Sequence, residues 1–238
     1  MEQSEIKKRL LETDWQSLAT DMNDRGYALI KNILPAGDCN NLIKMYENTT
    51  LYRKTITMER YRFGKGEYKY FNYPLPPLIK MIRETIYPHL ARIANNWMQV
   101  LKAGSPFPSD YGELQELCHS HKQDKPTVLI LKYGEGGFNT LHQDLYGEIY
   151  FPMQLVIFLN EPGSDFTGGE FVLTEQIPRA QSRAIVLQPQ RGDMLLFTTN
   201  FRPAKGKNGY YRVNMKHGVS EVHQGNRHTL GIIFHDAL

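Results

Sequence analysis

The sequence contains no run of about 18 consecutive apolar residues, so we expect no transmembrane helix. Its first residues, MEQSEIKKRLLETDW, carry charges throughout and lack the apolar core of a secretory signal peptide. Only two cysteines are present, Cys39 and Cys118, and they lie too far apart to suggest a disulfide framework. Together these absences predict a protein of the reducing cytoplasm.

The sequence also lacks a strong excess of charge, an internal repeat and a low-complexity linker. Its 238 residues carry a formal net charge of +3, which permits an anionic partner without requiring one. Hydrophobic residues make up 41% and charged residues 22%, as is typical of globular proteins. Because no linker interrupts the chain, we expect one domain over residues 1–238, with a mostly helical part over 1–124 and a β core over 125–238.

Apolar residues recur at helical spacing in the first 124 residues. Gly26 is expected to end the first helix, Pro35 to begin the second, and Pro88 to kink the third. Strands are expected over residues 27–34 and, as a pair around Gly64 and Gly66, between residues 51 and 73. The expected helices cover residues 4–26, with apolar positions Ile6, Leu10, Leu11, Leu18 and Met22, and residues 35–48, 75–102 and 111–122.

From Lys125 onward the composition changes to short β-branched and aromatic runs bounded by glycine, proline or asparagine. Seven such runs without intervening helices predict a β-sandwich or a jelly roll. We therefore expect an α+β fold in which the helical half packs on a β core. The runs are TVLILKY, FPMQLVIFLN, GEFVLTE, AIVLQP, GDMLLFTT, YRVNMKH and RHTLGIIFH.

The stretch NTLHQDLYGE holds an imidazole and a carboxylate two residues apart, His142 and Asp144. Residues two apart on a strand face the same side, so these side chains can bind one ion. His217, just before a glycine at the end of a predicted strand, is the preferred third ligand. Two histidines and one carboxylate leave three positions open on an octahedral ion, which suits non-haem Fe(II). Alone, H-x-D is more often an ordinary polar turn, and His223, His228 and His235 are alternative third ligands.

Arg227 strengthens the case for a metal site, because it opens the apolar strand RHTLGIIF ten residues beyond His217. A buried arginine needs a partner, and its planar fork suits a carboxylate held at two points. Thr229 lies two residues on and shares the same face of the strand. An α-keto diacid that chelates the metal at one end would present its far carboxylate to this pair.

The order His142-x-Asp144, His217 and Arg227-x-Thr229 resembles that of the Fe(II)- and 2-oxoglutarate-dependent oxygenases, whose core is a double-stranded β-helix. The prolyl-hydroxylase-like branch is most similar, since DFTGGEFVL resembles its Gly-Gly turn. KYGEGG resembles its segment upstream of H-x-D, where Tyr133 can reach the cosubstrate. HQDLYGEIYFPMQL, GGEFVLTEQ and RHTLGIIFHDA resemble a bacterial family of unknown substrate that is loosely labelled as acting on damaged nucleic acid.

The resemblance implies Fe(II), 2-oxoglutarate and dioxygen as cofactors. It implies His142, Asp144 and His217 as the metal ligands, with no further catalytic acid or base. Arg227, assisted by Thr229 or Tyr133, would bind 2-oxoglutarate. Decarboxylation of 2-oxoglutarate to succinate would accompany hydroxylation, or oxidative demethylation, of an unidentified substrate. One residue departs from the pattern: Phe158 stands where the prolyl hydroxylases often carry a tyrosine that binds the far carboxylate.

Two stretches mix basic and aromatic side chains, a combination that can follow a nucleic-acid strand. A solvated hairpin and a sheet edge protected by charge are the alternatives. The first stretch, NFRPAKGKNGYYR, contains Arg202, Lys205, Lys207 and Arg212 with Tyr210 and Tyr211. The second, MERYRFGKGEYKYF, contains Arg60, Arg62, Lys65 and Lys69 with Tyr68 and Tyr70.

Other functions remain open at this point. The run CHSH at residues 118–121 has zinc-ligand chemistry, but without a second cluster it cannot close a four-ligand site, so a surface helix is favoured. A jelly roll that binds metal without turnover, a protein hydroxylase and a small-molecule hydroxylase are the alternatives to a nucleic-acid oxygenase. The sequence does not predict an oligomeric state.

Overall fold

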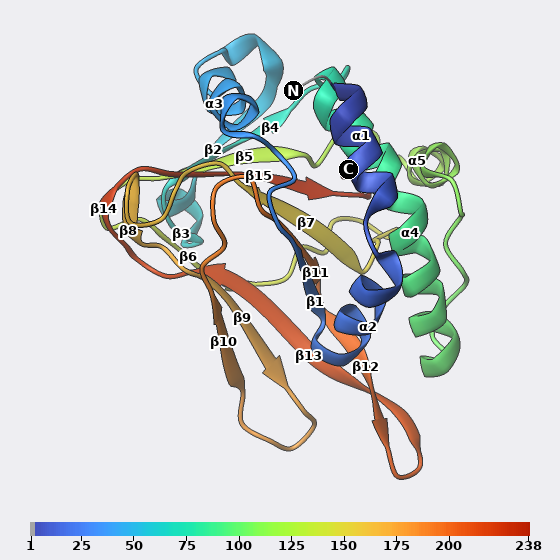
Figure 1. Cartoon of the computed structure of the whole chain (residues 1–238). Helices are drawn as coiled ribbons and strands as arrows, with labels where there is room; N and C mark the ends of the chain where they lie inside the picture. Colours follow the sequence, from blue (N-terminus) through green and yellow to red (C-terminus); the bar gives the residue numbers. More distant parts are fainter. Residues whose placement is uncertain (1–2) are drawn as a thin grey trace.

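The computed structural model describes residues 3–238, and Figure 1 shows its helices grouped largely on one side of the strands. None of the described helices is long and apolar enough to cross a membrane. Cys39 and Cys118 are both buried as free thiols. The α-helices are α1 (Gln3–Glu12), α2 (Trp15–Arg25), α3 (Ala36–Met45), α4 (Pro77–Leu101) and α5 (Tyr111–Ser120), and two 3-10 turns are η1 (Thr49–Leu51) and η2 (Met58–Tyr61).

Two antiparallel sheets form the core, and a cavity lies between them. The larger has the strand order β1-β11-β7-β15-β5-β4-β2, and the smaller β10-β9-β13-β6-β3, with β12 paired to β13 and β14 to β8. This is the expected α+β fold with a jelly-roll core. The strands are β1 (Tyr27–Ile30), β2 (Tyr52–Thr57), β3 (Gly64–Lys65), β4 (Glu67–Phe71), β5 (Leu129–Tyr133), β6 (Phe138–His142), β7 (Met153–Phe158), β8 (Phe166–Gly168), β9 (Phe171–Gln176), β10 (Arg183–Leu187), β11 (Met194–Thr198), β12 (Phe201–Gly206), β13 (Gly209–Val219), β14 (Val222–Gly225) and β15 (Arg227–Ile233).

The prediction of one helix over residues 4–26 is wrong, because the helix is broken after Glu12. The carboxylate of Asp14 accepts a hydrogen bond from the backbone N–H of Ser17 at 3.0 Å and so caps a new helix, α2. Leu11, counted in the apolar stripe of the expected single helix, is 56% exposed, whereas Ile6 and Leu10 are buried. Gly26 ends α2 as expected, in the left-handed conformation with φ 77°.

The first 124 residues contribute strands to both sheets in addition to the helices that pack on the β core. β1, β2 and β4 belong to the larger sheet, where β1 pairs with β11 and β4 pairs with β5. All seven strand runs expected after Lys125 are strands, and β6, β8, β12 and β14 add to them. The smaller sheet likewise takes β3 from the N-terminal half.

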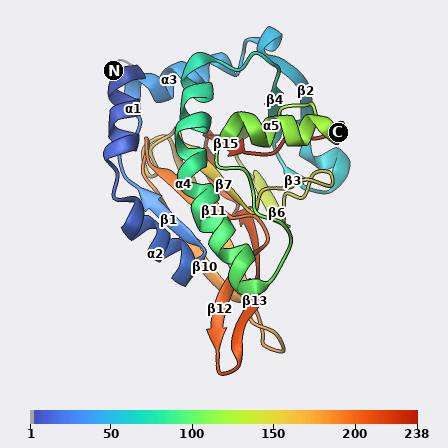
Figure 2. The same ribbon diagram turned by 90° about the vertical axis from the view of Figure 1, so that its right-hand side faces the viewer.

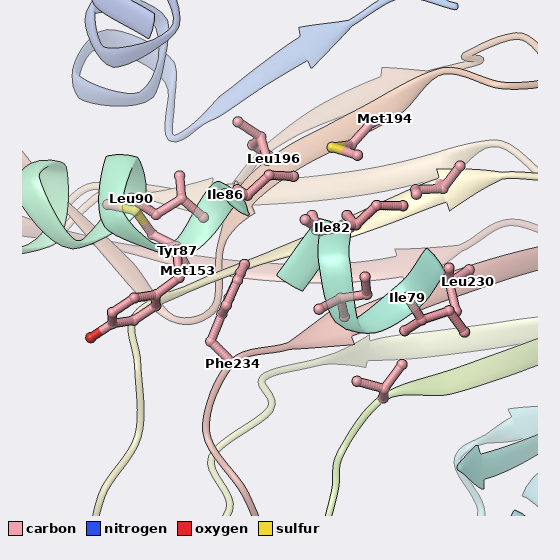
Figure 3. Packing of buried hydrophobic residues seen from close by; sticks show 14 of the residues in the cluster. Ile79, Ile82, Ile86, Tyr87, Leu90, Met153, Met194, Leu196, Leu230 and Phe234 are labelled. Carbon is pink, nitrogen blue, oxygen red and sulfur yellow. The ribbon is translucent and has the colours of Figure 1, made fainter. Parts of the chain in front are cut away.

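Helix α4 packs its apolar stripe on the larger sheet and continues through Pro88 as one helix. Figure 2 shows it lying across the strands, and Figure 3 shows the packing from close by. Burying these side chains contributes roughly 1.5–3 kcal/mol each to folding. It also holds β7, β11 and β15 in place, and β15 carries Arg227. The stripe consists of Ile79, Ile82, Ile86, Leu90 and Ile93, which meet Met153, Met194, Leu196 and Leu230 of the sheet.

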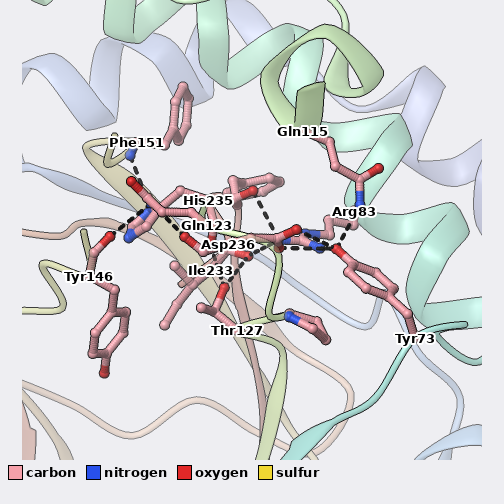
Figure 4. Close-up of polar contacts among 12 residues, drawn as sticks. Tyr73, Arg83, Gln115, Gln123, Thr127, Tyr146, Phe151, Ile233, His235 and Asp236 are labelled. Atoms are coloured by element: carbon pink, nitrogen blue, oxygen red, sulfur yellow. Dashed lines mark hydrogen bonds and ion pairs between the residues drawn. The ribbon is translucent and has the colours of Figure 1, made fainter. Parts of the chain in front are cut away.

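A buried ion pair joins α4 to the C-terminal segment (Figure 4). Arg83 is fully buried, and its guanidinium lies 3.0 Å from the carboxylate of Asp236. The same guanidinium donates to the backbone carbonyls of Ile233 and Phe234, each at 2.9 Å. Tyr73 donates its hydroxyl to Asp236 at 2.8 Å. With this many partners, the buried charges are compensated and the end of β15 is anchored.

Gln123 connects this anchored segment to the loop that follows H-x-D, also visible in Figure 4. Its side-chain amide donates to the carbonyls of Asp236 at 2.6 Å, Ile149 at 2.8 Å and Tyr146 at 3.1 Å. Its amide oxygen accepts from the N–H of Ile149 at 2.8 Å. The conformation of the loop over residues 146–149 therefore depends on a residue more than twenty positions earlier.

Candidate active site

Strands β6 and β13 bring the two histidines of the expected triad face to face. His142 and His217 are directly opposite in the antiparallel register, and their ring centroids lie 4.2 Å apart. Asp144 follows the end of β6, with one carboxylate oxygen 3.3 Å from Nε2 of His217 and the other 3.7 Å from Nε2 of His142. Ligand atoms of the three residues lie within 4.8 Å of one another, and no other such group occurs among residues 3–238.

The charge state of this cluster suits a divalent cation. Burial raises the pKa of the Asp144 carboxyl, but hydrogen bonding and charge interaction with His217, and the charge of His142, outweigh it and hold that pKa well below its usual range. Burial lowers the pKa of His217, and the neighbouring His142 lowers it further. One carboxylate beside neutral imidazole is the donor set that Fe(II) takes in non-haem oxygenases.

The backbone aims the ligand atoms inward. Nδ1 of His142 lies 2.7 Å from the carbonyl oxygen of Thr140. A carbonyl only accepts, so Nδ1 carries the proton and Nε2 is free to bind metal. Between the two candidate ligands His142 and Asp144, the side chain of Gln143 donates to the carbonyls of Met215 at 2.7 Å and Asn200 at 3.1 Å. The middle residue of H-x-D thus anchors the loop next to β13.

Tyr146 contacts the carboxylate of the candidate ligand Asp144 directly, and the sequence pattern did not single it out. Its hydroxyl donates to Asp144 at 2.8 Å, and the hydroxyl of Tyr70, from β4, donates to Tyr146 at 3.3 Å. Both tyrosines line the cavity. The available signal was the spacing, because Tyr146 follows Asp144 by two residues.

We expect Tyr146→Phe to weaken Fe(II) binding about tenfold, because outer hydrogen bonds orient a ligating carboxylate and their loss typically costs 10–100-fold in affinity. Titration of the metal-free protein with Fe(II) under argon measures the effect. Tyr150→Phe is a matched control in the same loop, since that hydroxyl only accepts from Asn200 at 3.5 Å. Equal affinity in the two variants would contradict a positioning role for Tyr146.

Arg227 is buried without a partner in the part of the chain that the structure describes. It is 1% exposed, and none of its three guanidinium nitrogens makes a hydrogen bond. The rings of Tyr133 and Phe158 lie within 5.5 Å of the guanidinium. Burial lowers the pKa of Arg227 to about 10, so the group is still a cation at neutral pH. A buried cation with no hydrogen bond and no carboxylate in ion-pair contact is costly and indicates an anionic ligand.

The cavity between the sheets connects Arg227 with the triad. Its volume is about 220 Å³, and Tyr133 and Thr229 line it together with the three candidate metal ligands. Burial raises the pKa of Tyr133 to about 12, so its hydroxyl stays protonated, and the amide of Asn139 donates to it at 3.3 Å. The residues expected to meet a keto acid therefore line one cavity.

The Gly-Gly turn of DFTGGEFVL makes room for the arginine. Gly168 and Gly169 have φ angles of 69° and 63°, which favour glycine. A Cβ atom on Gly169 would lie 2.9 Å from Cδ of Arg227 and equally close to Val222. The sequence indicated a turn here, but only the structure relates it to the position of the guanidinium.

The other histidines lie elsewhere. His228 is buried on β15 with its ring 3.0 Å from the side-chain oxygen of Asn160, and His235 accepts from the backbone N–H of Phe151 at 3.0 Å. His223 is exposed on β14. The run CHSH does not converge on a site, because Cys118 is buried in α5 while His119 contacts Asp236 at 3.3 Å.

The basic stretches are only partly available to a partner. Arg202 is 9% exposed, with its guanidinium 3.0 Å from Glu175, so it is not available for the contact with nucleic acid that the sequence left open. Lys69 is also buried, and its ammonium donates to the carbonyl of Tyr46 at 3.0 Å. Tyr68 and Tyr70 point from β4 into the cavity. The exposed basic residues of the two stretches are Arg60, Arg62 and Lys65 beside β6, and Lys205, Lys207 and Arg212 on the β12–β13 hairpin.

Two comparisons at the sequence level place the chain in a family. Residues 66–237 match a family model described as "Oxygenase, catalysing oxidative methylation of damaged DNA". The uncharacterized protein Rv2227 of Mycobacterium tuberculosis is 44% identical over 167 residues, which cover 70% of this chain and 72% of that protein.

Solved structures agree in fold. A prolyl-4-hydroxylase from Pseudomonas putida superposes with a TM-score of 0.56 at 12% identity, covering 94% of this chain and 100% of that chain. An oxidoreductase of the 2OG-Fe(II) oxygenase family from Burkholderia pseudomallei superposes with a TM-score of 0.53 at 14% identity, covering 95% and 94%. At such identities the likeness concerns the fold alone. The family match shows that the chain belongs to the oxygenase family that the model describes, and its fold is the one found in these solved 2OG-Fe(II) oxygenases.

Proposed function

We propose that the chain is one oxygenase domain in which His142, Asp144 and His217 bind Fe(II) while Arg227 binds the 5-carboxylate of 2-oxoglutarate. The observation that carries the proposal is the fully buried guanidinium without a partner, in the same cavity as the triad. With Fe(II), 2-oxoglutarate and dioxygen bound, such a site yields succinate and carbon dioxide and inserts one oxygen atom into a C–H bond of the substrate. One domain is supported by β1, β2 and β4, which complete the larger sheet.

The side chains around Arg227 have two tasks in this proposal. Tyr133 and Phe158 exclude water from the salt bridge with the cosubstrate, which strengthens it. The hydroxyl of Tyr133 or Thr229 donates the hydrogen bond that Phe158 cannot make. Phe158 lies opposite Thr229 in the register of β7 and β15. The Thr229 hydroxyl therefore lies next to the position of the tyrosine hydroxyl that Phe158 lacks.

We further propose that the substrate is a nucleic acid with a methylated base. The family description names damaged DNA, and exposed basic residues occur beside β6 and on the β12–β13 hairpin. Hydroxylation of a methyl group on nitrogen gives a hydroxymethyl group, which breaks its carbon–nitrogen bond to release formaldehyde and restore the N–H. Dioxygen and 2-oxoglutarate supply the oxidising equivalents, so the reaction balances without another oxidant.

Binding of a methylated single-stranded oligonucleotide should weaken steeply with salt, because released counterions drive such association. Replacing Arg60 and Arg62 by alanine should lower the slope of log affinity against log salt by about 0.7 for each phosphate that the variant no longer neutralises. Fluorescence anisotropy between low and high salt measures this slope. The matched control is Lys7→Ala with Lys8→Ala, which removes two exposed charges from α1.

Other results would redirect the proposal. If no oligonucleotide binds at low salt, a protein or small-molecule substrate is the better alternative. If the Fe(II)-loaded protein forms no succinate from 2-oxoglutarate, with or without nucleic acid, the chain is a metal-binding jelly roll without turnover.

A further inference from the structure

Exposed apolar side chains gather beside the candidate metal centre. Ten large hydrophobic residues are exposed in the described part of the chain, and half of them lie in η2, β6 or the two short segments that adjoin them. Scattered exposed apolar residues need no explanation, but a local group marks an interaction site. The five are Tyr61, Phe63, Phe138, Leu141 and Leu145, and Phe63 also lines the cavity.

Two of these side chains form a stacked pair. The rings of Tyr61 and Phe63 are stacked, with centroids 5.4 Å apart and planes 17° from parallel, yet they are 52% and 45% exposed. The carbonyl oxygen of Phe63 accepts hydrogen bonds from the backbone N–H and the hydroxyl of Thr140, each at 2.8 Å. Since Thr140 precedes His142 by two residues, the pair is fixed to the strand that carries a metal ligand.

Positive charge is interleaved with these rings. Arg60, Arg62 and Lys65 are exposed on the same short segment. The one acidic residue among them is Glu59, whose carboxylate accepts a hydrogen bond from the backbone N–H of Gly66 at 3.4 Å. Alternating cations and exposed ring faces match alternating phosphates and bases, which is how proteins hold single-stranded nucleic acid. An uncharged peptide would leave the arginines without a partner.

We infer that the Tyr61–Phe63 pair is a stacking platform for an unpaired base next to the nucleotide that enters the cavity, with Arg60 and Arg62 on the flanking phosphates. This inference rests on the proposed function, since it specifies single-stranded nucleic acid as the form of substrate. A duplex base has both faces covered by its neighbours, so a ring can stack only on a base that has left the helix.

The experiment measures binding of an about 12-nucleotide labelled single strand, and of the matching duplex, to protein loaded with Fe(II) and 2-oxoglutarate under argon. Tyr61→Ala with Phe63→Ala should weaken single-strand binding by roughly 5- to 140-fold, which is the range that the loss of base–aromatic stacking gives per base. Tyr61→Trp should bind at least as tightly as the wild type. Leu11→Ala, which removes a comparably exposed apolar side chain from α1, should change neither binding nor succinate formation.

Each outcome decides a separate claim. If the double variant keeps its fold by thermal unfolding and binds the single strand like the wild type, the platform is overturned while the nucleic-acid substrate stands. Tighter binding of the duplex than of the single strand also overturns it. If the wild type binds neither form at low salt, the nucleic-acid substrate itself fails. Should the double variant not fold, Tyr61→Ala alone against Tyr61→Trp decides, because Tyr61 is half exposed and the fold does not depend on its ring.

Discussion

Alanine at His142, Asp144 or His217 should each abolish Fe(II) binding and the conversion of 2-oxoglutarate to succinate. The loss should be complete, because two remaining ligands cannot hold the ion against water and three open positions are needed for cosubstrate and dioxygen. Asp144→Ala removes the charged ligand and is expected to be the most severe. Equilibrium dialysis with Fe(II) and a succinate assay measure the two effects.

The fold should survive these substitutions, since the three side chains line a cavity and do not fill the core under α4. His223→Ala is the matched control, because this exposed histidine lies six residues beyond His217 and outside the cluster. Wild-type turnover in any triad variant would refute the assignment. Loss of activity in His223→Ala together with full activity in His217→Ala would show that the third ligand is misplaced.

Arg227→Ala should raise the apparent constant for 2-oxoglutarate by at least about a hundredfold while Fe(II) still binds. Removing one member of a buried pair costs roughly 3–5 kcal/mol, and about 1.4 kcal/mol is tenfold. Arg227→Lys should lose less, because it keeps the charge without the planar fork. Steady-state assays across 2-oxoglutarate concentrations give the constant, and metal titration gives the Fe(II) affinity.

Pyruvate separates a role in carboxylate recognition from a role in folding. It lacks the distal carboxylate, so it should be a poor cosubstrate for the wild type and no worse for Arg227→Ala. Arg227→Met keeps most of the side-chain volume, so the fold should persist. Because methionine cannot bind the distal carboxylate, the unfolding temperature of this variant should not rise when 2-oxoglutarate is added, whereas that of the wild type should. Equal damage to pyruvate and 2-oxoglutarate use would mean that Arg227 supports the fold or the metal instead.

The sequence predicted the elements whose pattern is local. The apolar spacing of residues 75–102 predicts α4, and the seven β-branched runs predict the jelly-roll core, because these periods reflect which face each element buries. The residues of the candidate site, the triad and Arg227, stood out in the sequence for a different reason. Their residue types are uncommon at such positions, and their order is the one that the resembled oxygenases share. The helix break was also locally encoded, since Asp14 is a favourable cap, but the apolar period concealed it.

Tertiary structure alone decided the features that depend on partners far apart in the chain. Arg202 looks like an exposed cation in the sequence, yet it is buried and forms an ion pair with Glu175 on β9, a strand that also pairs with β13. Gln123 bonds the backbone of Tyr146 to that of Asp236 in the C-terminal segment, and in this position the Tyr146 hydroxyl donates to Asp144. The stacked rings of Tyr61 and Phe63 lie beside the cavity because β3 pairs with β6, which is distant in the sequence. Contacts of this kind produce no periodic pattern in the sequence. Each forms between residues that come together only when the two sheets pack against each other.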